Sequence, residues 1–140
     1  MYRSKHFQLQ ELVHPDIFNE RGERAWELLS PALLQSLDQL RAKFGPVIIN
    51  TWHSQKLTDK YGRRVDSGMR KHDASIGAKW SAHKFGLAAD CLFADVTVTY
   101  VRKYVIDHPD EFPFISAIED GVSWFHFDCR NCTPIKVFKP

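Results

Sequence analysis

The sequence lacks the features that mark secreted, membrane-spanning or fibrous proteins. Its 140 residues include three cysteines, an odd number that builds no disulfide framework and fits a reducing compartment. No apolar run approaches the length of a membrane span, and residues 1–10 contain no apolar stretch typical of a signal peptide. We therefore expect a soluble protein that is made in the cytoplasm without a signal peptide and reaches any target outside it by another route.

The sequence also lacks a strong excess of charge of one sign. A net charge of +2 and a pI near 8.5 are mildly basic and far from the values typical of nucleic-acid-binding proteins, so we expect no nucleic-acid partner. By contrast, the apolar content of 44% and the aromatic content of 13% are ample for one core. Since repeats and linkers are also lacking, we predict a single domain over residues 1–140. The sequence leaves the oligomeric state open, with a monomer as the default expectation.

The three cysteines leave two interpretations open. Cys129 and Cys132 have the spacing of half a structural zinc site, and Cys91 could join them if its strand neighbours theirs. Burial in apolar surroundings is the more common fate of free cysteine. We therefore expect packing roles, with a second metal site as the alternative.

Local signals predict helices in both halves of the chain. Ser30 and Pro31 are an N-cap and a first helical residue, the apolar residues that follow have helical spacing, and Gly45-Pro46 ends the helix. Residues 98–108 show a second helical pattern, which Pro109 ends. Residues 6–13 have spacings that allow a short helix or a docked arm.

Strand signals complete an α+β fold. Residues 47–52 and 87–93 are typical of buried strands, the second of them central. Residues 114–119 and 122–128 predict a hairpin around the two-residue turn Asp120-Gly121, and residues 135–138 an edge strand. We predict an antiparallel sheet with a metal on one face and helices on the other, and the polar segment 53–80 as a wall of the cleft.

The stretch from Ser81 to Asp90 has the layout of a metal site. It joins the imidazole of His83 to the carboxylate of Asp90 through a turn at Gly86 that leads into the buried strand. A third ligand is available in His126, whose side chain shares a strand face with Asp128 because strand side chains alternate.

These residues resemble a known family. The pattern Ser-x-His-x-x-Gly-x-Ala-x-Asp at residues 81–90, together with Ser-Trp-x-His-x-Asp at residues 123–128, is similar to that of zinc D-alanyl-D-alanine carboxypeptidases and phage L-alanyl-D-glutamate endopeptidases. This family shares its fold with the hedgehog signalling domain. Phe-x-Leu-x-Glu at residues 7–11 and Ser-Gly-x-Arg at residues 67–70 also agree, so the resemblance spans about residues 6–130.

The resemblance implies roles for individual residues. It makes His83, Asp90 and His126 the ligands of one Zn²⁺, with a fourth position open for water. It makes Arg70 a catalytic and substrate-binding residue that clamps a substrate carboxylate or steadies an oxyanion. In the surroundings of the ligands, Ser81 is expected to hold His83 or its loop, and Asp128 to orient His126.

The general base departs from the family pattern. Many members place an acid three residues before the second histidine, where this chain has Ser123. Related members place the acid in the preceding loop, which makes Glu119 the predicted base. With a two-residue turn, however, Glu119 would pair with Val122 and lie about 13 Å along the strand from His126, unless a looser loop brings it back.

Three tryptophans, Trp52, Trp80 and Trp124, are candidates for a ligand pocket, although buried aromatic residues more often only pack. Trp124, which lies within the second motif, is the predicted substrate-binding residue.

The resemblance implies a zinc metallopeptidase that cuts a peptide bond in bacterial peptidoglycan. We expect a phage or prophage lysis or virion protein that acts on the wall after release or as part of the particle. The missing acid at position 123 keeps two alternatives open: a non-catalytic zinc-stabilised binding module, and a structural component of a phage particle.

Overall fold

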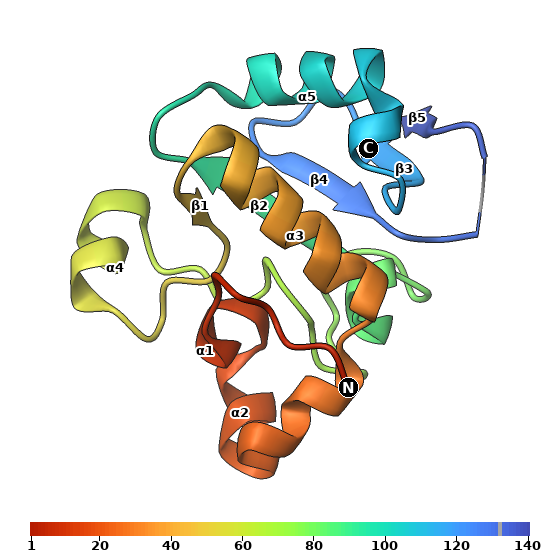
Figure 1. The fold of residues 1–140 in the computed structure, drawn as a ribbon. Helices are drawn as coiled ribbons and strands as arrows, with labels where there is room; N and C mark the ends of the chain where they lie inside the picture. The colour runs from red at the N-terminus through yellow and green to blue at the C-terminus, as the bar shows by residue number, and fades with distance from the viewer. Residues whose placement is uncertain (132) are drawn as a thin grey trace.

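One sheet with helices packed against it forms the protein (Figure 1). The computed structural model describes residues 1–131 and 133–140. The helices are α1 (Leu9–Leu12), α2 (Pro15–Arg21), α3 (Pro31–Phe44), α4 (Gln55–Tyr61) and α5 (Val98–Asp107), with short 3-10 helices η1 (Gly22–Leu28), η2 (Ala82–Phe85) and η3 (Pro109–Glu111). The strands are β1 (Val47–Ile48), β2 (Ala88–Phe93), β3 (Ala117–Glu119), β4 (Phe125–Asp128) and β5 (Lys136–Phe138).

The sheet has five strands in the order β1-β2-β4-β3-β5. Neighbouring strands are antiparallel except β3 and β5, which are parallel. The α+β fold class is thus confirmed, while the prediction of a wholly antiparallel sheet is wrong at one edge. The reason is the last connection, which carries the chain past β3 and reverses it before β5 begins. The central position belongs to β4, and β2 lies beside it.

The two predicted long helices are confirmed with their caps. The Ser30 hydroxyl accepts a hydrogen bond from the Ala32 amide at the start of α3, and Gly45 ends that helix with a φ of 83°. At the start of α5, the Thr97 hydroxyl accepts a hydrogen bond from the Tyr100 amide.

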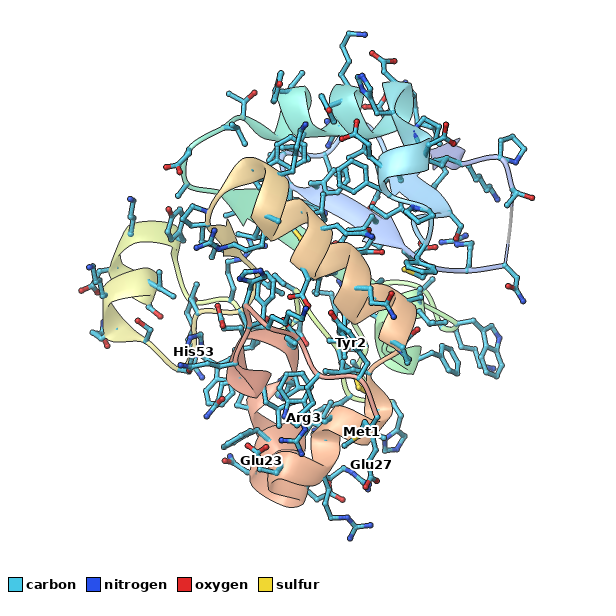
Figure 2. All side chains as sticks on the ribbon, in the orientation of Figure 1. Met1, Tyr2, Arg3, Glu23, Glu27 and His53 are labelled. Carbon is cyan, nitrogen blue, oxygen red and sulfur yellow. The ribbon has the colours of Figure 1, made fainter. Side chains whose placement is uncertain are left out.

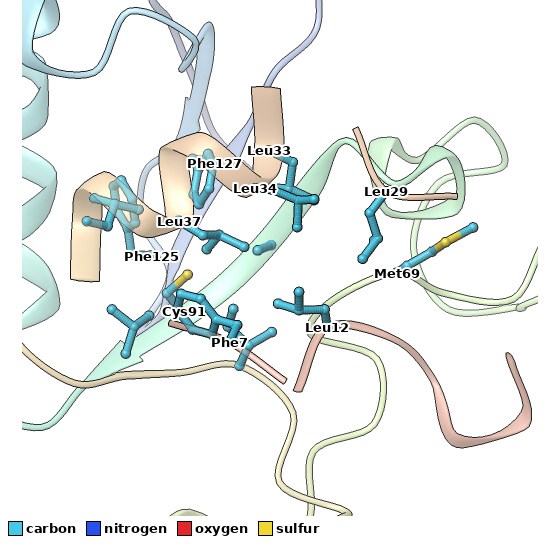
Figure 3. Packing of buried hydrophobic residues seen from close by; sticks show 14 of the residues in the cluster. Phe7, Leu12, Leu29, Leu33, Leu34, Leu37, Met69, Cys91, Phe125 and Phe127 are labelled. Atoms are coloured by element: carbon cyan, nitrogen blue, oxygen red, sulfur yellow. The ribbon is translucent and has the colours of Figure 1, made fainter. Parts of the chain in front are cut away.

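The main core lies between α3 and one face of the sheet. Figure 3 shows Leu33, Leu34 and Leu37 of α3 beside Phe125 and Phe127 of β4. Because side chains alternate along a strand, the odd-numbered residues of β2 and β4 face this helix and the even-numbered residues face away from it. The sheet therefore has a second face on which polar residues of these strands come together.

Cys91 and Cys129 lie on the helix side. Cys91 is fully buried in the core, and the thiol of Cys129 lies 3.9 Å from the hydroxyl of Ser36 on α3. Within residues 1–131 and 133–140, neither belongs to a group of donors that could hold a metal. Cys132 lies outside the described residues.

The polar segment 53–80 contains a helix that the sequence analysis missed. α4 is capped by the Ser54 hydroxyl and has no buried residue, so it carries no apolar stripe that periodicity could detect. The strand expected over residues 47–52 is shorter, because only Val47 and Ile48 pair with β2, although Ile49 to Thr51 remain buried. None of the described helices is long and apolar enough to cross a membrane.

Candidate metal centre

Two neighbouring strands bring Asp90 and His126 together. β2 and β4 pair so that Asp90 lies directly opposite His126. Both side chains point to the face away from α3, and the Oδ1 atom of Asp90 lies 2.8 Å from the Nδ1 atom of His126. Antiparallel pairing thus joins residues that are 36 positions apart in the chain.

His83 reaches the same point from η2, which precedes β2. The Ser81 hydroxyl accepts a hydrogen bond from the His83 amide at 3.4 Å, so Ser81 caps the turn as expected of a residue that holds this loop. Gly86 follows with a φ of 67°, and a Cβ atom there would lie 2.0 Å from the Leu28 carbonyl oxygen, which leaves room only for glycine.

The orientation of the His83 ring is set by a backbone carbonyl. Nδ1 of His83 lies 2.8 Å from the Gly68 oxygen, so this nitrogen carries the proton and donates it. The Nε2 atom faces the other two residues. With 2% of its surface exposed, His83 presents this atom inside the protein.

The three donor atoms form a compact triangle. Nε2 of His83 lies 3.2 Å from Oδ1 of Asp90 and 3.2 Å from Nδ1 of His126. A tetrahedral zinc ion with bonds of about 2.0–2.1 Å needs donors roughly 3.3 Å apart, so the observed spacings fit such an ion with small adjustments. Two imidazole nitrogens and one carboxylate oxygen are also a donor set that zinc accepts. The group could therefore hold a metal ion with one position left open.

Asp128 and Arg130 hold the far side of the His126 ring. Oδ2 of Asp128 lies 3.2 Å from Nε2 of His126, which leaves Nδ1 directed at Asp90. The guanidinium of Arg130 donates to both oxygens of Asp128, each at 2.6 Å. A carboxylate on the second nitrogen of a ligand histidine fixes the ring, which is the geometry expected for the predicted role of Asp128. The sequence analysis missed Arg130.

The charges of the group depend on one another. Burial alone would raise the pKa of Asp90, but hydrogen bonds with His126 and His83 outweigh burial and hold this pKa well below its usual range. Burial would likewise lower the pKa of His126, but hydrogen bonds to Asp128 and Asp90 raise it to about 9. In the metal-free protein, His126 is therefore protonated at neutral pH.

Arg70 lies beside the metal centre. Its Nη2 atom is 3.3 Å from Oδ2 of Asp90, the oxygen outside the donor triangle, and its Nε donates to the Asp66 carbonyl. Gly77 closes over the guanidinium, because a Cβ atom at Gly77 would lie 2.6 Å from Nη1 of Arg70. The predicted substrate-binding arginine is thus fixed next to a ligand.

Glu119 lies far closer to His126 than the sequence suggested. β3 and β4 pair Ile118 with Phe127, and this register places Glu119 opposite His126 rather than opposite Val122. The Oε2 atom of Glu119 is 4.0 Å from Nδ1 of His126, and its side chain is 16% exposed. The prediction of a two-residue turn is wrong, and the longer loop between β3 and β4 brings the predicted base to the metal centre.

Arg102 of α5 shapes this loop. Its guanidinium donates to the carbonyl oxygens of Glu119 at 3.2 Å, Val122 at 2.9 Å and Trp124 at 2.9 Å. Three bonds from one largely buried side chain hold the loop against the helix. Sequence reasoning missed Arg102, because its position on an amphipathic helix looks like that of any surface cation.

The tryptophans and remaining histidines divide among several roles. Trp124 is half-buried just before β4, and its substrate role stays a prediction. Trp52 packs against Phe18 and donates to the Val13 carbonyl, so it has a structural role. His14 caps α2, and His53 lies on the side of α4, away from the β4 end of the sheet (Figure 2).

No protein-family model, curated protein or solved structure matches this chain.

Proposed function

We propose that this chain is a zinc-dependent metallopeptidase that hydrolyses a peptide bond in the stem peptides of bacterial peptidoglycan. The proposal includes membership of the family of zinc D-alanyl-D-alanine carboxypeptidases and phage endopeptidases, with their hedgehog-like fold, and a setting in phage or prophage lysis or in a virion. One observation carries it: the donors of His83, Asp90 and His126 lie within 3.2 Å of one another, with the carboxylate of Glu119 4.0 Å from one of them.

The three ligands would hold Zn²⁺ through two neutral imidazoles and one carboxylate. A zinc ion in such a site supplies Lewis acidity, which lowers the pKa of a bound water to about 7 and polarises a carbonyl. Binding requires that His126 give up its Nδ1 proton, because a protonated nitrogen has no lone pair to donate.

Glu119 is the proposed general base. Its Oε2 atom lies 4.0 Å from the ligand nitrogen, so a water bound to an ion there would be in hydrogen-bond reach of the carboxylate. As the water oxygen bonds to the amide carbon, Glu119 accepts a water proton. It then passes that proton to the leaving nitrogen as the C–N bond breaks. Every atom and proton of the hydrolysis is accounted for by water, the peptide and this one carboxylate.

Arg70 is the proposed substrate clamp. A guanidinium can pair with a carboxylate through two parallel hydrogen bonds, and stem peptides carry free carboxylates near their scissile bonds. Because Nη2 of Arg70 is held by Asp90, the guanidinium is fixed beside the reacting carbonyl rather than moving freely.

The proposal is tested with purified protein, zinc and isolated wall material. We expect a loss of turbidity together with new amino termini, and both are abolished by a chelator and restored by Zn²⁺. Glu119→Gln lowers the rate by about 10²- to 10⁴-fold. Asp110→Asn, which changes an exposed acid outside this loop, is the matched control and retains activity.

Two outcomes contradict parts of this proposal. Zinc binding without any cleavage would support the alternative, a zinc-stabilised binding or structural module of a phage particle. Full activity of Glu119→Gln together with chelator-sensitive cleavage would leave a metallopeptidase but reject Glu119 as its base.

A further inference from the structure

Two aromatic side chains are stacked on the protein surface beside the metal-binding loop. The rings of Trp80 and Phe85 have centroids 6.3 Å apart and an interplanar angle of 16°. Trp80 is 75% exposed and Phe85 is 51% exposed. Large apolar side chains gathered on a surface mark an interaction site, because each gives up favourable burial to stay there.

This pair is attached to a ligand of the metal centre. η2 carries His83 pointing inward and Phe85 pointing outward, since a 3-10 helix turns by about one third per residue. Hydrogen bonds from Ser81 to Ala78 and from Lys84 to Ser81 fix the turn that joins the two aromatics. Consecutive Cα atoms are about 3.8 Å apart, so the Cα of Phe85 lies within about 8 Å of that of His83. A polymer on the rings would therefore pass close to the site.

The surroundings of the pair are basic. Residues 74–86 contain two lysines and no acidic residue. The Lys79 ammonium lies 5.6 Å from the Trp80 ring centroid, and the Lys84 ammonium donates to the Lys79 carbonyl at 3.4 Å. Such a surface attracts a partner that carries negative charge, and a second copy of the same loop would bring only more lysines.

We infer that Trp80 and Phe85 form a docking surface for the glycan strand of peptidoglycan, with Lys79 and Lys84 facing the carboxylates of its stem peptides. This inference rests on the proposed function, because it takes the carbohydrate to be the polymer that bears the peptide cut at the metal centre. The C–H groups of a pyranose ring carry partial positive charge and pack on the electron-rich face of an indole. The lysine ammonium groups supply the charge complementarity that neutral aromatic rings lack.

The test compares intact wall sacculi, which contain the glycan strand, with the free stem peptide, which lacks it. Trp80→Ala lowers kcat/KM on sacculi by about tenfold, the order expected for the loss of one ring stacked on an aromatic side chain, and changes it less than about twofold on free peptide. Phe85→Ala shows the same split with a smaller effect. Tyr100→Ala removes an exposed aromatic from α5 as the matched control and changes neither rate.

A binding assay tests the surface without catalysis. Glu119→Gln protein sediments with sacculi, and the double variant with Trp80→Ala shows a lower bound fraction. Soluble β-1,4-linked N-acetylglucosamine oligomers, added as competitors, also lower the bound fraction. If the wild-type protein cuts neither substrate, the proposed function fails, while this sedimentation still decides the docking surface.

Three results would overturn the inference. One is an equal loss on both substrates in Trp80→Ala, which would place the ring against the peptide or in the fold. Another is unchanged sedimentation and unchanged cleavage. The third is a different partner for the rings. If Trp80→Ala changes the molecular mass in solution, the rings serve self-association; if it abolishes binding to a single-stranded oligonucleotide, they serve nucleic-acid binding.

Discussion

In the proposed metal centre, zinc and a proton would compete for the same nitrogen of His126. In the metal-free protein this histidine lies between the carboxylates of Asp90 and Asp128, which raise its pKa to about 9 from the ordinary 6.5. The Nδ1 atom must lose its proton before it can bind a metal. The apparent metal affinity is therefore expected to depend steeply on pH in the range where most histidines no longer titrate.

The size of this dependence follows from the pKa. Below about pH 9, each pH unit changes the deprotonated fraction of His126 about tenfold. Asp90 has its pKa held low and stays ionised throughout, so it adds no further dependence. Between pH 6.5 and 8.5 the apparent zinc affinity should rise by about 100-fold.

Calorimetry measures both the affinity and the protons released. Zinc is titrated in competition with a chelator of known affinity, in pairs of buffers that differ in ionisation enthalpy. At pH 7 the binding of one ion should release about one proton from His126 in addition to that of the bound water, and the share from His126 should approach zero above about pH 9. Asp128→Asn is the informative variant, because removing one raising carboxylate shifts this transition to lower pH. A constant affinity between pH 6.5 and 8.5, with no proton released at pH 7, would refute the assignment of a protonated His126.

Three further predictions follow from individual contacts. Arg102→Lys keeps the charge but can donate to fewer of the three carbonyl oxygens, so it should lower kcat by about 100-fold. A double-mutant cycle should show that it lowers kcat little further when Glu119→Gln is already present. Gly77→Ala puts a methyl group on a residue with a φ of 75°, so it should lower the free energy of unfolding by about 1–2 kcal/mol. Because that methyl group would press against Arg70, the proposed substrate clamp, the substitution should also raise KM. Metal-free protein should be most stable toward denaturant below pH 6.5 and lose up to about 3 kcal/mol as pH rises through 9, because the folded state binds the His126 proton more tightly than the unfolded state does.

Elements with local signals could be predicted from the sequence. The helix α3 begins at Ser30-Pro31 and ends before Gly45, because caps and breakers act within a few residues of the chain. The same holds for α5, although α4 was missed because a helix without buried residues has no apolar periodicity.

The grouping of the metal donors could be predicted in part. A motif of ten residues contains both His83 and Asp90, and strand alternation predicts that His126 shares a face with Asp128. The pairing of Asp90 with His126 depends on which strands become neighbours, which no local pattern determines. Before the structure, the need for a third ligand and the resemblance to a family were what joined the two motifs.

The position of Glu119 could not be predicted, because a distant residue overrides the local turn signal. Asp120-Gly121 is typical of a two-residue hairpin turn. In the structure, however, Arg102 donates hydrogen bonds to the carbonyl oxygens of Glu119 and Val122, the two residues that would flank that turn. The loop therefore extends to residue 124, and β3 shifts by four positions relative to β4 from the predicted register.

The proposed ligands and the proposed base thus depend on different parts of the fold. Asp90 and His126 are held by the pairing of β2 with β4, which the packing of Phe125 and Phe127 against α3 stabilises. Glu119 ends β3, which pairs with β4 and β5, and the Arg102 guanidinium holds the loop that follows it. Changes in the loop should therefore abolish hydrolysis while zinc binding remains, whereas changes in the core should affect both together. A few substitutions in the loop would then convert an enzyme into an inactive module that still binds zinc. Metal affinity alone therefore cannot distinguish an enzyme from such a module.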